Sequence, residues 1–234
     1  MPSITSLLSY AAIALLTSSQ LSAASPVPIC QIRARNAPGL PTTGSGTQLP
    51  PVSAGLNLKF VTLGRGVQNY TCSGDYGTPV AVGAIAEIFE ITALAQWNPV
   101  SPLFTGLPAA AAYLTIPGVQ QLLNTRMPAG NPATIIGKHY FTSAGVPTFD
   151  LYARSKKLSS KLVAKVSAPA NANVGPAGTG AVGWLKLDDA GGSVGLKEVY
   201  RVYTAGGNPP ASCSGHTAGA VFTVEYAAMY WFYG

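Results

Sequence analysis

The stretch LKFVTLGRGVQNYTC, residues 58–72, decides the fold class of this chain. Its first half alternates apolar and polar residues, as a β-strand does, and a Gly-Arg-Gly triplet at 64–66 then interrupts the alternation. Two glycines around an arginine inside a strand indicate a β-bulge or a close approach of another backbone. The segment therefore predicts a central strand that presents Arg65, Gln68 and Asn69 at a particular place.

Short apolar segments separated by turn signals follow this strand. They lie at residues 80–94, 138–151, 161–166, 181–187, 197–203 and 220–232. The first of them fits a strand or a helix, and its β-branched and aromatic residues favour a strand. Residues 98–117 are rich in proline and are expected to form a loop, whereas Pro117–Asn124 predicts a short helix. This pattern predicts an all-β fold, an antiparallel sandwich or closed barrel with long loops and at most one or two short helices.

Composition and the first residues indicate a protein that is exported. Only 9% of the 234 residues are charged, against about a quarter in typical soluble domains. Residues 1–24 have the apolar run and the small residues before a cleavage point that are typical of a signal peptide. Residues 25–54 predict an extended lead rich in proline and glycine, and 55–234 a single β domain. No later stretch reaches the ~18 apolar residues of a membrane helix, so no membrane span is expected.

The chain has three cysteines, an odd number for an oxidising compartment. Cys72 and Cys213 both end extended segments and are expected to pair, which leaves Cys30 free or in an intermolecular bond. Asn69-Tyr70-Thr71 is a glycosylation sequon, so Asn69 is a candidate glycosylation site.

The formal net charge is +6, and many of the basic residues lie between positions 154 and 165. In Lys161–Val166 they alternate with apolar residues, which predicts one basic strand face and one buried face that includes Leu162. The basic face is either solvated or attracted to an anionic surface, such as a cell-wall polymer. No nucleic-acid-binding motif is present, so nucleic acid is not expected as a partner.

His139 and Asp150 form the most interesting candidate for catalysis. A two-residue hairpin loop would place the two residues opposite each other, whereas a three-residue loop would place His139 opposite Phe149. A carboxylate that orients an imidazole is part of many nucleophilic sites, and Arg201 is a further candidate. The alternative is a cross-strand polar pair without catalytic function. No Gly-x-Ser-x-Gly elbow supplies a nucleophile.

Metal and cofactor sites find little support in the sequence. With two histidines and three cysteines, the chain has too few of the usual ligands for a typical zinc site. The glycines at 191–195 lack the preceding strand and following helix of a dinucleotide site. We therefore expect neither a metal nor a cofactor.

Aromatic residues are concentrated in the last quarter of the chain. Exposed Trp184 could stack on sugar rings as part of a binding site. The alternative is packing in the core, which the strongly apolar strands around Trp184 and residues 230–233 favour.

Five ordered motifs together point to a family. They are LGRGVQNYTC, GKHYFTSAGVPTFDL, AVGWLKL, VYRVYTAGGNPPASC and VEYAAMYWFY. Over residues 50–234 the chain resembles the exported fungal and bacterial proteins of domain of unknown function 3455. The resemblance implies no established activity, and the name malate dehydrogenase that some fungal members carry has no physical support in this sequence.

Four polar residues lie inside these otherwise apolar motifs and are candidate binding residues: Arg65, Gln68, His139 and Arg201. They either form buried hydrogen-bonded structure or line a pocket. We expect a secreted, non-enzymatic protein that binds a polysaccharide or another anionic ligand at the cell wall. The alternatives are a secreted hydrolase that uses His139 and Asp150, and a host-directed secreted factor.

Overall fold

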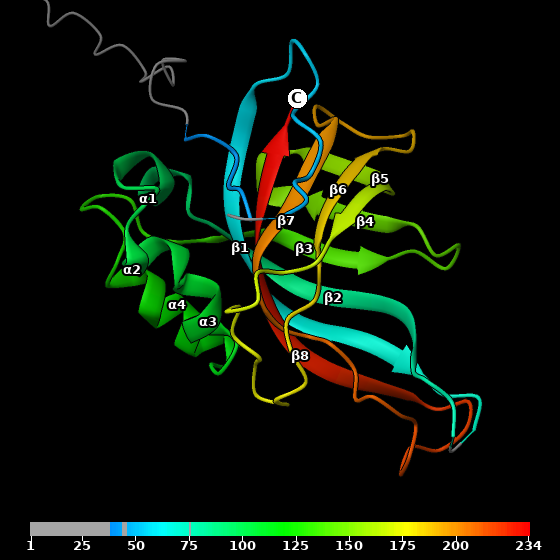
Figure 1. Cartoon of the computed structure of the whole chain (residues 1–234). Helices are drawn as coiled ribbons and strands as arrows, with labels where there is room; N and C mark the ends of the chain where they lie inside the picture. Colours follow the sequence, from blue (N-terminus) through cyan, green and yellow to red (C-terminus); the bar gives the residue numbers. More distant parts are fainter. Residues whose placement is uncertain (1–37, 44–45, 75) are drawn as a thin grey trace, which may run out of the picture. The chain divides into compact units, whose positions relative to one another are not determined.

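A computed structural model gives the structure and describes residues 38–43, 46–74 and 76–234. Within these residues eight antiparallel strands form a closed barrel, in which each strand pairs with the next and the last pairs with the first (Figure 1). The strands are β1 (Leu58–Thr71), β2 (Val80–Glu90), β3 (Ile135–Phe141), β4 (Pro147–Leu151), β5 (Lys156–Val166), β6 (Trp184–Asp189), β7 (Glu198–Gly206) and β8 (Val221–Tyr233). The all-β prediction is confirmed, and the barrel is the architecture formed. The expected signal peptide and Cys30 lie outside the described residues.

Four short α-helices lie between β2 and β3 in the described part of the chain, more than the one or two expected. They are α1 (Thr92–Trp97), α2 (Pro102–Thr105), α3 (Leu107–Ala111) and α4 (Ile116–Asn124), and a 3-10 turn follows β4 at Tyr152–Arg154. The expected helix near residues 117–124 is confirmed as α4. The loop prediction for 98–117 was wrong, because prolines occupy the first turns of α2, α3 and α4. The N–H groups of a first turn make no hydrogen bond within the helix, so proline, which lacks this group, is tolerated there. The strand prediction for 80–94 holds only to Glu90, since the residues after Ile91 begin α1.

Two apolar layers hold the barrel together. Side chains alternate between the two faces of each strand, so one set fills the barrel interior and the other packs outside it. The interior set includes Phe149, Tyr226 and Tyr230, while the outer set packs with the helices. Among the helices, α3 contacts the outer side of β1, β7 and β8 (Figure 1). Strand β8 is therefore buried on both faces over its second half.

The Gly-Arg-Gly triplet of β1 marks a close approach rather than a bulge. A Cβ on Gly64 would lie 2.5 Å from the Tyr230 ring, and one on Gly66 would lie 1.9 Å from the backbone oxygen of Ile85. The irregularity in the pairing of β1 with β2 comes later, between Asn69 and Tyr70. Glycine at these positions lets β2 and the β8 side chains come close to β1.

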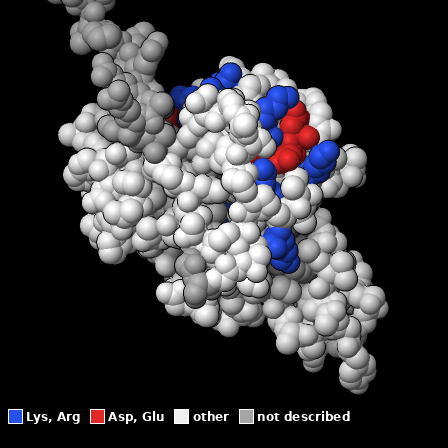
Figure 2. Space-filling view, turned by 45° about the horizontal axis from the view of Figure 1, so that its top comes forward, with Lys and Arg blue, Asp and Glu red and all other residues white. Residues whose placement is uncertain are grey.

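Strand β5 departs from the expected basic and buried faces. Its register with β6 shifts between Leu162 and Ala164, and Leu162 is 56% exposed. The prediction that Leu162 is buried was therefore wrong, although Leu162 faces the same side of the strand as the buried Leu158. The bulge follows Leu162 and moves Ala164 and Val166 to the opposite face, so the single buried face expected for residues 161–166 does not form. Lys161 is exposed and lies opposite Asp188 of β6. Figure 2 shows basic and acidic side chains gathered together on one part of the face in view.

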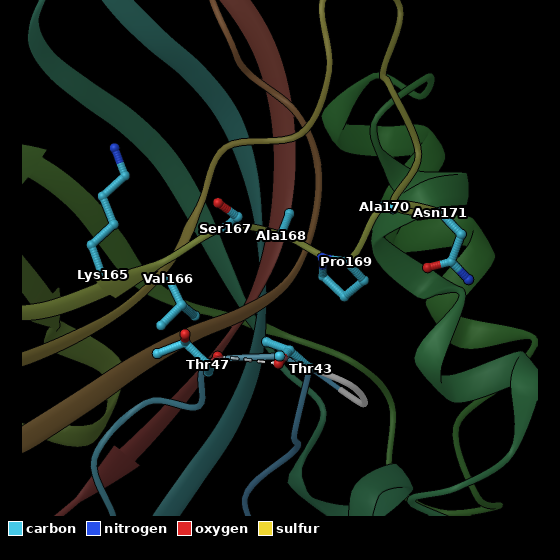
Figure 3. Close-up of a pocket in the computed structure, with 10 residues that line it drawn as sticks. Thr43, Thr47, Lys165, Val166, Ser167, Ala168, Pro169, Ala170 and Asn171 are labelled. Carbon is cyan, nitrogen blue, oxygen red and sulfur yellow. Dashed lines mark hydrogen bonds between the residues drawn. The ribbon is translucent and has the colours of Figure 1, made fainter.

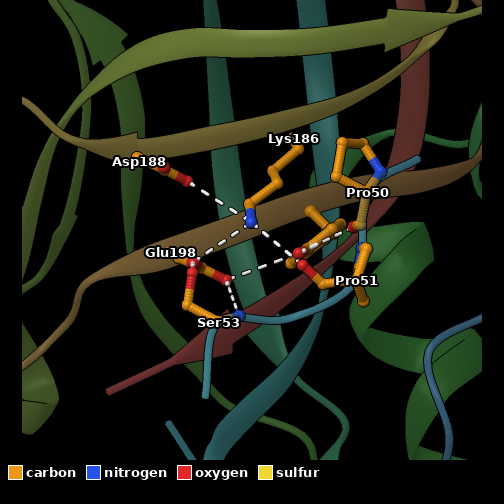
Figure 4. Close-up of polar contacts among 7 residues, drawn as sticks. Pro50, Pro51, Ser53, Lys186, Asp188 and Glu198 are labelled. Atoms are coloured by element: carbon orange, nitrogen blue, oxygen red, sulfur yellow. Dashed lines mark hydrogen bonds and ion pairs between the residues drawn. The ribbon is translucent and has the colours of Figure 1, made fainter. Parts of the chain in front are cut away.

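The described end of the lead lies across the outer side of β6 and β7. Lys186 and Glu198 form an ion pair of 3.2 Å there, although both side chains are almost fully buried. The lead completes this cluster, since the Pro51 carbonyl accepts a 3.0 Å hydrogen bond from Lys186 and Ser53 bonds to the Glu198 carboxylate (Figure 4). The Pro50 carbonyl accepts a further hydrogen bond from the Tyr200 hydroxyl. The last residues of the lead, although without regular structure, thus pack on the barrel.

Candidate functional site

A cavity of about 310 Å³ inside the barrel brings together most of the polar residues that the sequence singled out. Its apolar lining consists of Ala84, Phe141, Pro147, Phe149, Leu162, Leu185 and Leu187. Its polar lining consists of Gln68, His139, Arg201 and Tyr230. These side chains come from β1 to β8 and meet because every second residue of a barrel strand points inward. Phe141 and Leu162 are partly exposed and mark the mouth of the cavity.

His139 lies on the wall of the cavity as a neutral imidazole. Its Nδ1 is 3.0 Å from the Thr148 carbonyl oxygen, which can only accept, so Nδ1 carries the proton and Nε2 is an acceptor. The ring stacks on Phe149 with a centroid distance of 4.2 Å. The pKa of His139 is lowered from 6.5 to about 4, chiefly by burial, against the opposing effect of the Thr148 hydrogen bond and with a smaller lowering effect of the Arg201 charge.

Arg201 places a positive charge inside the barrel. Its Nε and Nη2 atoms donate to the Gly183 carbonyl oxygen at 3.2 and 2.8 Å. The residue is 9% exposed, and it forms no ion pair with any residue that the structure describes. Its charge acts on several cavity groups, since it lowers the pKa of His139 and partly offsets the raised pKa of Tyr230.

A tyrosine pair and an amide lie beside these two residues. The hydroxyl groups of Tyr226 and Tyr230 are 2.9 Å apart, and burial raises the pKa of both phenols. Gln68 lies close enough to lower the pKa of Tyr226 slightly, yet its buried Nε2 has no hydrogen bond of good geometry in the described structure. The Gln68 amide is therefore a buried donor beside Tyr226 that has no full hydrogen bond in the described structure.

The structure separates His139 from Asp150. The hairpin loop has three residues, between Thr142 and Val146, so His139 lies opposite Phe149 and Asp150 lies opposite Lys138. Of the two registers considered from the sequence, this is the one without a His-Asp pair. Because neighbouring strand residues point to opposite faces, Asp150 points away from the cavity that His139 lines.

Arg65 and Trp184 also lie outside the cavity. Arg65 forms a 2.9 Å ion pair with Glu225 and donates to the Leu114 carbonyl oxygen, so it connects β1 to β8 and to the helical segment. Trp184 is 1% exposed and packs edge-on against Tyr203. A buried indole cannot offer its face to a sugar ring, so the core alternative holds for Trp184.

The predicted disulfide between Cys72 and Cys213 is confirmed. It ties the end of β1 to the loop before β8. Asn69 is partly buried, and its Oδ1 has no hydrogen bond in the described structure. Glycosylation of Asn69 stays a prediction.

A larger hollow of about 670 Å³ lies outside the barrel, between the lead and residues 165–171 (Figure 3). Its wall is formed by small and polar residues, and Lys165 extends away from Thr43 and Thr47. No group of three or more His, Cys, Asp or Glu side chains among the described residues is placed to hold a metal ion. No helix in the described part of the chain is long and apolar enough to cross a membrane.

Sequence reasoning did not select Tyr226 and Tyr230 as site residues, although both belong to a motif of the resemblance. The signal was present, because inward positions of β8 alternate as Tyr226, Ala228, Tyr230 and Phe232. This alternation could not be used from the sequence alone, because the sequence does not show which face of β8 points into the barrel.

The fold and site define the class: an up-and-down eight-stranded β-barrel with a largely apolar internal cavity that carries a few polar groups. Within that class, the chain belongs to the family described as protein of unknown function (DUF3455), whose model matches residues 52–234. The resemblance read from the motifs is thereby confirmed. No curated protein and no solved structure matches the chain.

Proposed function

We propose that this protein binds a small molecule inside its barrel and acts by binding rather than by catalysis. The observation that carries the proposal is the interior cavity, with seven apolar and four polar residues in its lining. Ligand sites of small molecules have this composition, an apolar wall with a few polar groups that orient the ligand. Eight-stranded barrels have an interior just wide enough for side chains or for one small ligand.

The dimensions favour a small ligand over the polysaccharide considered from the sequence. The cavity volume of about 310 Å³ is at the lower end of the range of ~300 to 1,000 Å³ that is typical of ligand pockets. A polymer would need an extended surface with exposed aromatic rings, and Trp184, the ring that the sequence offered for this role, is buried.

Hydrolysis is the weaker alternative. The cavity lining contains no serine or cysteine and no carboxylate, and a backbone carbonyl rather than Asp150 orients the His139 ring. A neutral His139 can accept a hydrogen bond from a ligand without a nucleophile beside it.

We place this binding function outside the cell. The Cys72–Cys213 disulfide supports this proposal, because such bonds persist in oxidising compartments, and so does the signal-like composition of residues 1–24. Mass spectrometry of protein from the culture medium of producing cells should find a mature N-terminus near residue 25. Uncleaved protein that stays inside those cells would contradict it.

A ligand screen with a blocked cavity tests the binding function. The domain is screened by thermal shift against a library of small apolar and amphipathic molecules, since a ligand at 100 times its Kd adds ~2.7 kcal/mol to the free energy of unfolding. Ala84→Leu fills the cavity, and Ala81→Leu makes the same change at an exposed position of the same strand.

We expect molecules whose stabilisation is lost in Ala84→Leu and kept in Ala81→Leu. Stabilisation that survives Ala84→Leu would show that the ligand binds elsewhere. A library without any stabilising molecule would also count against the proposal.

A further inference from the structure

Arg201 is the feature of the cavity that its own protein environment does not explain. Burying a charge is unfavourable by several kcal/mol unless an opposite charge compensates it. The other buried cations of the barrel have such partners, since Arg65 pairs with Glu225 and Lys186 with Glu198. Arg201 has no carboxylate partner among the described residues, and none lines the cavity.

The guanidinium keeps donors free for an anion. Its Nε and Nη2 share one acceptor, the Gly183 carbonyl oxygen, and its remaining protein neighbour of note is the neutral Tyr230 hydroxyl. An arginine carries five N–H donors in a planar fork that suits the two oxygens of a carboxylate. The side of the guanidinium that carries Nη1 and the other Nη2 proton makes no hydrogen bond to the described residues, apart from its contact with the Tyr230 hydroxyl.

Gln68 adds a second donor to the same cavity. Its Nε2 is buried and lacks a hydrogen bond of good geometry in the described structure, and leaving a buried amide unsatisfied is unfavourable. A ligand oxygen that accepts from both Gln68 and Arg201 would satisfy both residues at once. His139 contributes no positive charge, because Nδ1 holds the only ring proton of its neutral form.

We propose that the ligand is an apolar carboxylic acid whose carboxylate pairs with Arg201 and accepts a hydrogen bond from Gln68. This inference rests on the binding function proposed above and names its ligand class. The carbon skeleton lies against the apolar wall formed by Phe149, Leu185 and Leu187 and extends toward the mouth at Leu162. A carboxylate is favoured over a phosphate because one negative charge balances the single cation, whereas a second would remain buried and unpaired.

Three ligands with the same chain and different heads test the inference: decanoate, decanol and decylamine. Their affinities are measured by isothermal titration calorimetry near neutral pH with the wild-type domain. We expect decanoate to bind at least about tenfold more tightly than decanol, because a hydrogen bond to a charged group contributes about 1.5 to 3 kcal/mol. Decylamine should bind most weakly, since it would place a second cation beside Arg201.

Variants then assign the selectivity to Arg201. Arg201→Gln should weaken decanoate binding by about 10- to 100-fold and leave decanol binding nearly unchanged. Lys59→Gln removes one positive charge from the exposed face of β1 and should change neither affinity. Gln68→Leu should weaken decanoate alone by roughly tenfold, and it replaces Arg201→Gln if that variant does not fold.

The outcomes separate this inference from the binding function. Equal affinities of the wild type for decanoate and decanol would overturn the carboxylate inference and leave a binding barrel in place. An Arg201→Gln variant that loses stability but keeps the preference for decanoate would show that Arg201 stabilises the fold through its hydrogen bonds to Gly183 and does not bind the ligand. If none of the three ligands binds, the inference fails, and the Ala84→Leu screen decides separately whether the barrel binds anything.

Discussion

Lowering the pH toward 4 should destabilise this protein through His139. Burial lowers the pKa of this imidazole from 6.5 to about 4 in the folded state, whereas in the unfolded state it titrates near its usual value. Between these two values the unfolded chain binds more protons, so stability rises with pH and is lost as pH falls through this window. A tenfold change in a protonation equilibrium corresponds to ~1.4 kcal/mol, so the loss approaches about 3 kcal/mol near pH 4.

No negative charge near His139 compensates the positive charge of its protonated form. Arg201 faces it from β7 and repels the imidazolium, and the nearby phenol of Tyr230 on β8 is neutral. No acidic side chain lines the cavity. Asp189 titrates lower, because hydrogen bonds from Lys197 and Ser193 hold its pKa near 2. Burial raises the pKa of Asp188, which acts in the opposite direction as pH falls, so the comparison of the wild type with a variant at position 139 isolates the contribution of His139.

Urea unfolding followed by tryptophan fluorescence at several pH values measures this effect. His139→Gln keeps a donor for the Thr148 carbonyl and cannot be protonated, so its stability should stay flat where the wild type loses about 2 to 3 kcal/mol. His216→Gln removes the other histidine and should leave the wild-type profile unchanged. The reasoning is refuted if the wild type and His139→Gln show the same pH dependence.

Three further perturbations test the barrel itself by urea or thermal unfolding. Cys213→Ser breaks a disulfide between residues separated by 141 positions, and should lower the free energy of unfolding by about 2 to 5 kcal/mol. Gly66→Ala places a Cβ 1.9 Å from a backbone oxygen of β2 and should lower it by more than about 2 kcal/mol, whereas Gly74→Ala, with open space around its Cβ, should be nearly neutral. Lys186→Met leaves Glu198 buried without its partner and should destabilise by about 3 to 5 kcal/mol, most of which Lys186→Met with Glu198→Gln should recover.

Each of these expectations has a clear contrary result. Stability of Cys213→Ser equal to that of the wild type without reducing agent would mean that the disulfide does not form in solution. Equal melting temperatures for Gly66→Ala and Gly74→Ala would argue against a tight approach of β2 to β1. A double variant at 186 and 198 no more stable than Lys186→Met would mean that packing by the lysine stem, not its charge, supports this face.

Local patterns determined several elements of this protein before any tertiary contact was known. The alternation in β1, the hairpin of β3 and β4 and the helix α4 depend on neighbouring residues, so sequence periodicity and turn residues were enough to predict them. The pairing of Cys72 with Cys213 followed from their positions at the ends of extended segments. The helices α2 and α3 were missed because their prolines were taken as loop signals, although proline is compatible with a first helical turn. Helix α1 was missed because its first residues were assigned to the strand predicted for 80–94.

Closure of the barrel and the composition of its cavity were decided only by the tertiary structure. Closure requires β1 to pair with β8, as in the alignment of Thr62 with Tyr230. Because these strands are far apart in the sequence, no local sequence pattern predicts how they align. Arg65 and Arg201 show the consequence, because both are arginines inside apolar strands. The closed sheet turns one outward to Glu225 and the other inward without a carboxylate. A shift of one residue in a strand exchanges the two faces, so only the closed barrel determines which arginine can meet a ligand.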